Sequence, residues 1–454
     1  MVRYLARFLP QAGWDVRVAA GSLGVPGEPT HAATFFSGTD VAPVDYTAAR
    51  AAEDPLAAVP PFQPSYEDRP GAPDRVFARV DDEAYERLVG AWRRELEAAE
   101  AGEADVLHLH HLTPVNEAAA RSFPDVPVVG HLHGTELLML DAIERGPPEG
   151  WTHAAAWAER MRGWARRCER LLVLSPDAVH RVPDLLGVER ERVVWAPNGF
   201  EPEGFDRRPR RGRDRLELWR RWLVDEPRGW RPGGREGSVA YAEEDLAPFA
   251  DGEAPVLLYV GRFTAVKRLP LLVRAYARAR EQFVRPAPLV LLGGHPGEWE
   301  GEHPLEAVEA CGASDVFLAG WRSHDELPDA LNAADVTVLA SVHEQFGQAL
   351  VEGMACGLPA IAIDAHGPAT IVEPGETGWL VPPDDAHALA GALVAAVNDD
   401  GRRTALAEAA YERSRMRYAW PALAAGVARV YEDVRRGREP GGGAVGLLPD
   451  PEAC

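Results

Sequence analysis

Two glutamates, Glu344 and Glu352, have the types and spacing expected of ligand-binding residues. Seven residues lie between them in HEQFGQALVEGMACGLP (343–359), which follows the strand-like run ADVTVLAS. We expect Glu344 in a loop and Glu352 about two turns into a helix that begins near Phe346. Carboxylates are good acceptors for hydroxyl groups. The pair therefore predicts a site for a polyol such as a sugar or a ribose.

The backbone at the start of this helix adds hydrogen-bond donors. The N–H groups of residues 346–348 lie at a helix N-terminus, where they have no partners within the helix. A simpler interpretation makes Glu344 a partner of the helix dipole and Glu352 an exposed helical residue. It does not explain why Glu352 is surrounded by apolar residues in the sequence, because a carboxylate in apolar surroundings needs a partner.

The segment GRFTAVKR (261–268) contains Lys267, the only lysine, whereas 47 of the 48 basic residues are arginines. It lies between the strand-like LLYV and the helical pattern LPLLVRAYARAR. Such a joint offers backbone N–H groups and the positive end of a helix dipole to an anion. Arg262 adds a planar fork and Lys267 a compact charge, so the two suit the oxygens of a diphosphate. The alternative is that Lys267 only begins an exposed helix.

Histidines gather in two strand-like segments, HLHH and HLHG, which hold five of the 14 in the chain. The alternation of side chains in a strand places His108 and His110 on one face, and likewise His131 and His133. A metal site is one interpretation, but no carboxylate ligand accompanies the histidines in the sequence. We therefore expect no metal, and we expect His108, His110 and His131 to pack or form hydrogen bonds within a sheet.

These residues follow strands in two separate series of elements. Short β-branched or Leu-rich runs alternate with longer helical patterns, which is typical of parallel sheets. The first series has strand-like runs at 14–21, 104–110, 126–134, 170–176 and 192–199, and the second at 255–262, 288–294, 314–321, 334–341, 358–364 and 378–385. The sequence thus predicts an α/β fold with two Rossmann-like domains, whose ligands bind at the carboxyl ends of the strands.

The expected division of the chain follows from the gaps between these runs. The domains and segments are 1–205, 206–252, 253–405, 406–436 and 437–454. We interpret 206–252 as a polar, solvated insertion with one short helix rather than a partner site, and we read 22–75 as loop-like. Helices in 406–436 are expected to cross back to the N-terminal domain. The tail is expected to be disordered.

Several spaced motifs resemble one enzyme family. GRFTAVKR, EQFGQALVEGMACGLP and GPATIVEPGETGWLVPPDD resemble the C-terminal domain of the retaining family-four glycosyltransferases of the GT-B fold, and VVGHLHGTE and VVWAPNGFEPEGF resemble the first domain. The resemblance spans residues 1–205 and 253–432. It implies two domains facing across a cleft and an enzyme that transfers a hexosyl or related group from a nucleotide diphosphate sugar, with retention of configuration and without a required metal or cofactor.

The resemblance also implies roles for individual residues. Arg262 and Lys267 would bind the diphosphate, Glu352 the ribose hydroxyls, and Glu344 the transferred sugar. The remaining donor-site positions are Gly261, Phe346, Gly347 and Gln348, and His133 would face the donor and the acceptor. The leaving diphosphate would accept the proton, so the catalytic stabilisation of its charge falls to Arg262 and Lys267.

The start of the chain departs from the family pattern. Family members begin with a strand and a Gly-rich loop, whereas MVRYLARFLPQAGWDVRV reads as the following helix and strand. We therefore expect the N-terminal sheet to lack an interior strand, which would leave unpaired backbone on both neighbouring strands. The hypothesis is that Met1 is an internal start and that roughly 15–30 residues precede it. If not, the chain is expected to be inactive.

Charge and composition limit the partners and the location. A net charge of −22 disfavours nucleic acid and anionic membranes, which leaves at most peripheral membrane contact. No apolar run approaches the roughly 18 residues of a membrane span. Four widely spaced cysteines suggest neither a disulfide framework nor a zinc ribbon and fit the cytoplasm. The expected partners are a nucleotide sugar and an unknown acceptor, for which a lipid, an inositol or a polysaccharide are all consistent.

Other functions are considered beside transfer. A P-loop ATPase and a standard dinucleotide enzyme are disfavoured because GxxxxGK[ST] and a strand-associated GxGxxG are both missing. A pyridoxal phosphate phosphorylase would need Lys267 as its Schiff base, although that position suits a diphosphate better. A sugar-nucleotide epimerase of the same fold and a catalytically inactive nucleotide-sugar-binding or scaffolding protein remain as alternatives.

Overall fold

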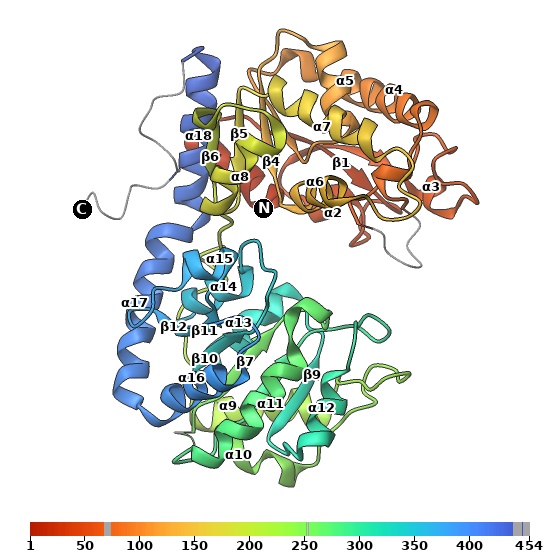
Figure 1. The fold of residues 1–454 in the computed structure, drawn as a ribbon. Coiled ribbons are helices and arrows are strands. Elements are labelled where there is room, and N and C mark those ends of the chain that lie inside the picture. The colour runs from red at the N-terminus through yellow and green to blue at the C-terminus, as the bar shows by residue number, and fades with distance from the viewer. Residues whose placement is uncertain (68–73, 251, 253, 439–446, 448–454) are drawn as a thin grey trace. The chain divides into compact units, whose positions relative to one another are not determined.

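The computed structural model describes residues 1–454 except 68–73, 251, 253, 439–446 and 448–454 (Figure 1). The chain divides into two compact units, which are described separately. Unit 1 comprises Met1–Pro197 with Trp420–Cys454, and unit 2 comprises Asn198–Ala419. The first boundary thus falls a few residues before the expected position at 205. Most of the tail expected to be disordered lies outside the described residues.

The strands of unit 1 form two sheets. They are β1 (Arg17–Ser22), β2 (Asp40–Asp45), β3 (Leu107–His110), β4 (Val128–Leu132), β5 (Arg170–Val173) and β6 (Val193–Trp195). Parallel β1 and β2 form one sheet, and β3, β4, β5 and β6 form a parallel sheet in that order. The strand β2 was not predicted, because Pro43 interrupts a run with few apolar residues; at a sheet edge this proline costs no hydrogen bond.

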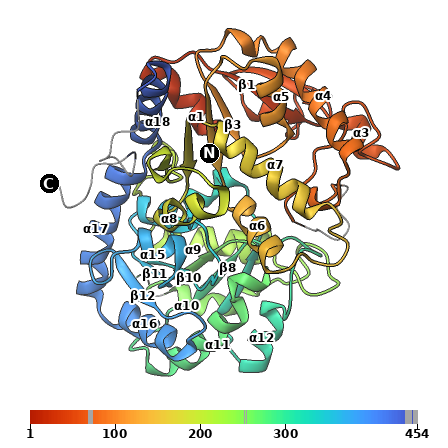
Figure 2. The same ribbon diagram turned by 45° about the horizontal axis from the view of Figure 1, so that its top comes forward.

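The division between the two sheets falls where the interior strand was expected to be missing. Among the described residues, β1 pairs only with β2 and β3 pairs only with β4. A cavity of about 1420 Å³ lies beside both strands and is lined by residues of each. Figure 2 shows helix α1 (Val2–Phe8) beside α18 (Trp420–Arg435), and the two helices are in contact. Unit 1 therefore has a wide, partly open cavity between its two sheets.

The other helices of unit 1 cover its sheets. They are α2 (Ala32–Phe35), α3 (Thr47–Ala51), α4 (Asp82–Ala98), α5 (Pro114–Ser122), α6 (Thr135–Arg145), α7 (Ala154–Arg167) and α8 (Pro176–Leu186). Buried tryptophans of α7, Trp157 and Trp164, pack in the same core as strand residues such as Leu171. This core holds β3 and β4, and hence their histidines, in place.

Unit 2 has one six-stranded parallel sheet. Its strands are β7 (Leu257–Val260), β8 (Leu289–Leu292), β9 (Val316–Gly320), β10 (Val336–Leu339), β11 (Ala360–Ile363) and β12 (Gly378–Val381). They lie in the order β12-β11-β10-β7-β8-β9, which is the doubly wound Rossmann order. All six lie within the predicted runs, because parallel strands covered on both faces are nearly continuous in apolar residues.

The helices of unit 2 surround this sheet. They are α9 (Gly212–Arg220), α10 (Ala247–Ala250), α11 (Leu269–Ala279), α12 (Pro304–Cys311), α13 (Leu327–Asn332), α14 (Gln348–Ala355), α15 (His366–Ile371), α16 (Ala386–Asn398) and α17 (Asp400–Tyr418). Figure 1 shows α16, α11 and α12 side by side, in agreement with their contacts. Of the helices expected in 406–436, α17 belongs to unit 2 and α18 to unit 1.

The prediction of a solvated insertion at 206–252 was wrong. Trp219, Trp222 and Trp230 are at most 1% exposed and belong to the core of unit 2. Arg215 on α9 is 2% exposed and forms an ion pair of 3.0 Å with Asp335, just before β10. The many arginines and prolines hid the apolar spacing of the tryptophans, so this segment is an integral layer of unit 2.

None of the helices in the described parts of the chain is long and apolar enough to span a membrane.

Candidate functional site

The predicted anion loop and the predicted glutamate loop follow neighbouring strands. The loop with Lys267 follows β7 and the loop with Glu344 follows β10, and these two strands pair in the middle of the sheet. The strand order reverses between them, and ligands of doubly wound sheets bind at that point, beyond the carboxyl ends of the strands. The topology thus places both loops at the expected ligand position of unit 2.

Lys267 and Glu344 form an ion pair between Nζ and Oε2. Their side chains are only 16% and 19% exposed, so the pair is largely removed from water. The N–H of Val342 donates to the carbonyl of Val266 at 2.9 Å and ties the two loops together. A lysine and a glutamate that are distant in the sequence are therefore held as one unit.

The start of α14 lies beside Glu344. Gly347 caps this helix with φ of 106°, a left-handed conformation that favours glycine. Within the described residues, no acceptor is found for the N–H groups of residues 346–348. The N–H of Gly367 donates to the carbonyl of Glu344 at 3.0 Å, and a Cβ at Gly367 would lie 2.3 Å from the carbonyl oxygen of Phe346. The free N–H groups are thus held next to a carboxylate.

Glu352 is 4% exposed and its carboxylate has two partners. Its Oε1 lies 3.0 Å from His324 Nε2 and accepts a hydrogen bond of 2.8 Å from Gln348 Nε2. Gln348 Nε2 also donates to the carbonyl of Gly199 at 2.9 Å, and His324 packs on Phe205. The carboxylate thus has the partner that its apolar surroundings require, and the interpretation of Glu352 as an exposed helical residue was wrong.

The loop after β7 is fixed from within the core. Tyr259 is fully buried and its hydroxyl donates to the carbonyl of Arg262 at 2.7 Å. Burial raises the pKa of Tyr259, so its hydroxyl remains protonated. Gly261 follows β7 directly, and the side chain of Arg262 is exposed. The backbone of this loop is therefore positioned by the sheet while the guanidinium remains accessible.

Two hydroxyl groups near this site were not predicted. The hydroxyl oxygens of Thr264 and Ser341 are buried and have no hydrogen-bond partner among the described residues. Thr264 lies in the loop after β7 and Ser341 immediately before Val342 in the loop after β10. Buried polar atoms are normally paired. Their position just after strands was the only sequence signal for them, and it is shared by many structural residues.

The histidines form a cluster in unit 1. His108 Nε2 lies 3.1 Å from His131 Nδ1, and His108 Nδ1 lies 2.5 Å from the hydroxyl of Tyr431 on α18. His110 Nδ1 lies 2.9 Å from His133 Nε2. The expectation that His108, His110 and His131 pack and form hydrogen bonds is confirmed. Burial lowers the pKa of His108 to about 3 and lowers those of His110 and His131 well below the usual value.

His133, the predicted unit 1 site residue, lies at the end of this cluster. Burial, together with the nearby His111, lowers its pKa to about 4, so the imidazole is neutral at pH 7. Its backbone N–H donates to Glu136 Oε2 at 3.2 Å. Glu136 is fully buried, and its other oxygen lies 2.6 Å from His111 Nδ1. His133 is thus a neutral donor or acceptor in a fixed position.

The structure therefore brings the predicted donor residues of unit 2 to one end of one sheet. The loops after β7 and β10 supply a cation, one carboxylate and free N–H groups, and α14 adds the carboxylate of Glu352. This arrangement can bind a ligand that combines an anionic part with a polyol part. His133 belongs to unit 1 and is positioned within that unit.

A doubly wound unit with such a site, preceded by a second parallel α/β unit, defines the chain as a GT-B protein of two Rossmann-like units. Residues 1–203 match the Glycosyltransferase Family 4 domain and residues 243–413 match the Glycosyl transferases group 1 domain. The chain belongs to this glycosyltransferase family.

Curated relatives carry related names. A D-inositol 3-phosphate glycosyltransferase of Acidothermus cellulolyticus is 29% identical over 74% of this chain and 68% of its own length. One from Kineococcus radiotolerans is 32% identical over 68% of this chain and 66% of its own length. The lipopolysaccharide core biosynthesis glycosyltransferase LpsE of Rhizobium meliloti is 34% identical, but over only 35% of this chain and 44% of its own length.

Solved structures support the fold. Sucrose-phosphate synthase from Thermosynechococcus elongatus superposes with a TM-score of 0.63 at 20% identity, and covers 96% of this chain and 93% of its own. HepE from Anabaena, solved in complex with UDP and glucose, gives 0.60 at 17% identity, with 95% of each chain covered. At this level of identity the likeness establishes the GT-B fold.

Proposed function

We propose that this protein is a retaining glycosyltransferase that moves a hexosyl or related group from a nucleoside diphosphate sugar to an acceptor hydroxyl. The observation that carries the proposal is the Lys267–Glu344 pair beside the free N–H groups of residues 346–348. An anionic diphosphate and a sugar are the two ligand parts that this combination suits. The solved complex of HepE with UDP and glucose supports a UDP-sugar donor.

The residues would act as follows. Donor binding displaces Lys267 from Glu344, so that the ammonium, with Arg262, contacts the diphosphate while Glu344 accepts hydrogen bonds from the sugar hydroxyls. Glu352 is positioned by Gln348 to accept hydrogen bonds from the ribose. As the bond between the anomeric carbon and the phosphate oxygen breaks, Lys267 and Arg262 stabilise the developing charge.

The acceptor oxygen then forms the new bond to the anomeric carbon, and its proton passes to the leaving diphosphate. Transfer in this form needs no resident cofactor and no metal ion. The acceptor is not assigned by these residues, since the names of the relatives include an inositol phosphate and lipopolysaccharide core biosynthesis. A cytoplasmic location remains a prediction.

The test is turnover with a panel of UDP-, GDP- and ADP-sugars, each with and without an inositol phosphate, a lipid and an oligosaccharide acceptor. Nucleotide release is measured, and the anomeric configuration of the product is read by NMR. We expect release to disappear in Lys267→Ala and Glu344→Ala and to persist in Arg274→Ala, which removes an exposed ion pair with Glu302, just before α12.

The substitution Lys267→Arg separates charge from shape. It retains the positive charge but replaces a compact ammonium by a planar fork. We expect a large loss of turnover with the fold intact. Nucleotide-sugar binding without turnover under all conditions would instead support an inactive binding protein, and conversion of the donor to its epimer without transfer would support an epimerase.

A further inference from the structure

Three histidines lie on one face of the sheet of unit 1. In the parallel pairing of β3 with β4, His110 lies directly opposite His131, and His108 lies opposite Val129. Because side chains alternate along a strand, His108 is on the same face as His110, two residues earlier. The strand register therefore gathers three imidazoles from two neighbouring strands.

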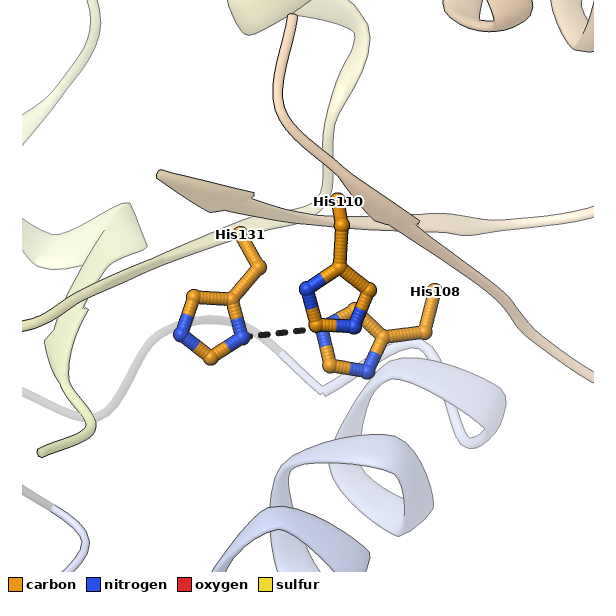
Figure 3. A group of neighbouring side chains, drawn as sticks. All are labelled: His108, His110 and His131. Atoms are coloured by element: carbon orange, nitrogen blue, oxygen red, sulfur yellow. Dashed lines mark hydrogen bonds between the residues drawn. The ribbon is translucent and has the colours of Figure 1, made fainter. Parts of the chain in front are cut away.

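The rings are close enough to share one ion. One ring nitrogen from each of the three lies within 4.8 Å of the others, and His108 Nε2 is 3.1 Å from His131 Nδ1. A tetrahedral zinc ion with bonds of about 2.1 Å needs ligand nitrogens about 3.4 Å apart. Figure 3 shows the three rings next to one another beside the strands, with a turn of helix below them. The three rings are stacked, with interplanar angles of 7° to 26°, so binding requires them to turn out of this stack until all three nitrogens point to the ion.

We propose that His108, His110 and His131 bind one divalent transition-metal ion of the zinc class. Three imidazoles with an open fourth position form a common zinc arrangement, and imidazole is a preferred ligand of this group of metals. No metal was expected from the sequence, because no carboxylate ligand accompanies the histidines there. A set of three histidines does not need one.

The surroundings of the rings fit this role. Metal-bound histidines usually form a hydrogen bond through the second ring nitrogen, which fixes the ring. His108 does so through Nδ1 with Tyr431 at 2.5 Å, and His110 through Nδ1 with His133 at 2.9 Å. These bonds leave Nε2 of both rings as the nitrogen that could bind an ion. Tyr431 and His133 are thus positioning residues of the site.

The site also has an entry path. The cavity of about 1420 Å³ in unit 1 is lined by His108, His110 and His111, so an ion and a water ligand can reach the two rings of β3. His131 is 1% exposed, and its Nε2 has no partner among the described residues. Its Nδ1, which lies 3.1 Å from His108 Nε2, is the nitrogen that would bind the ion. The site belongs to unit 1 and adds no step to the sugar transfer proposed above.

The test uses the 454-residue protein without a tag, after a chelator has removed bound metal. Zinc is titrated by calorimetry, and cobalt is added separately to record its visible absorption bands. We expect one ion per chain in both experiments, cobalt bands of a tetrahedral site, and displacement of cobalt by zinc. The absence of stoichiometric binding in the wild-type protein overturns the proposal.

Variants locate the ion. We expect His110→Gln to weaken zinc binding by at least about 100-fold and Tyr431→Phe by about 10–100-fold. His180→Gln, at an exposed histidine of α8, is the matched control and should bind as the wild type does. Circular dichroism checks that each variant is folded. If folded His110→Gln binds zinc as tightly as the wild type, the site lies elsewhere and the proposal is wrong; if it does not fold, the wild-type cobalt spectrum decides.

Discussion

The ion pair of Lys267 and Glu344 can be tested by a double-mutant cycle. The variants are Lys267→Met, Glu344→Gln and the double variant, each of which removes charge with little change in size. The two side chains are 16% and 19% exposed, so the contribution of the pair to stability should lie between those of exposed and fully buried ion pairs. Exposed pairs contribute about 0.2–1 kcal/mol, whereas removal of one partner from a fully buried pair costs about 3–5 kcal/mol.

We therefore expect each single substitution to lower the free energy of unfolding by about 2 kcal/mol, since each leaves one charge without its partner. The double variant should lose much less than the sum, with a coupling energy of about 1–2 kcal/mol. Urea unfolding of the four proteins gives the free energies. Arg274→Met is the control, because its exposed pair with Glu302 should contribute less than about 1 kcal/mol.

Binding of UDP tests whether the pair must open. UDP has a diphosphate but no sugar, so it needs Lys267 and not Glu344. We expect Lys267→Met to weaken UDP binding at least about 10-fold, the effect of about 1.4 kcal/mol, and Glu344→Gln to bind UDP at least as tightly as the wild type because its lysine is released. Additive unfolding energies, or weaker UDP binding in Glu344→Gln, would refute the reasoning.

Three further predictions concern other parts of unit 2. Burial lowers the pKa of His303 to about 4, below an unfolded value of about 6.5. The stability that the neutral imidazole contributes is therefore present above pH 6.5 and is lost as the pH falls toward 4. Between pH 7 and 4.5, the free energy of unfolding of the wild type in urea should fall by about 2.5 kcal/mol more than that of His303→Asn. Arg215→Met should destabilise unit 2 by about 1–3 kcal/mol, because the buried carbonyl of Ala254 loses its donor while Asp335 keeps Arg211 as a partner at 3.2 Å. Arg213→Met on the exposed face of α9 should change stability by less than about 0.5 kcal/mol. Gly347→Ala should strain the left-handed cap of α14 by about 1 kcal/mol and slow sugar transfer; an unchanged transfer rate would show that the N–H groups there do not bind the donor.

The strands of unit 2 were predicted well because of their burial. A strand covered on both faces reads as a continuous apolar run, and each was bounded by a turn and a helical pattern. The positions of Lys267, Glu344 and Glu352 just after or near such strands followed directly. Local sequence is sufficient here because alternation of strand and helix is a local property.

Prediction from the sequence failed where tertiary packing overrides local composition. The segment 206–252 is rich in charge and proline, yet its tryptophans pack in the core of unit 2. Its polar residues face outward or pair, as Arg215 does with Asp335. Composition averages over the two faces of a segment, so it cannot tell an amphipathic layer from a solvated loop. The strand β2 was missed for a related reason, since an edge strand needs few apolar residues.

By itself, the sequence determined where the strands lie, which loops follow them and which residue types those loops present. Only the tertiary structure decided that the loops after β7 and β10 are neighbours, that Lys267 pairs with Glu344, and that His110 faces His131 across a strand pair. The reason is physical. Hydrophobic periodicity is set by near neighbours along the chain, whereas strand order and register depend on contacts between segments many residues apart, and those contacts form only when the whole sheet is assembled.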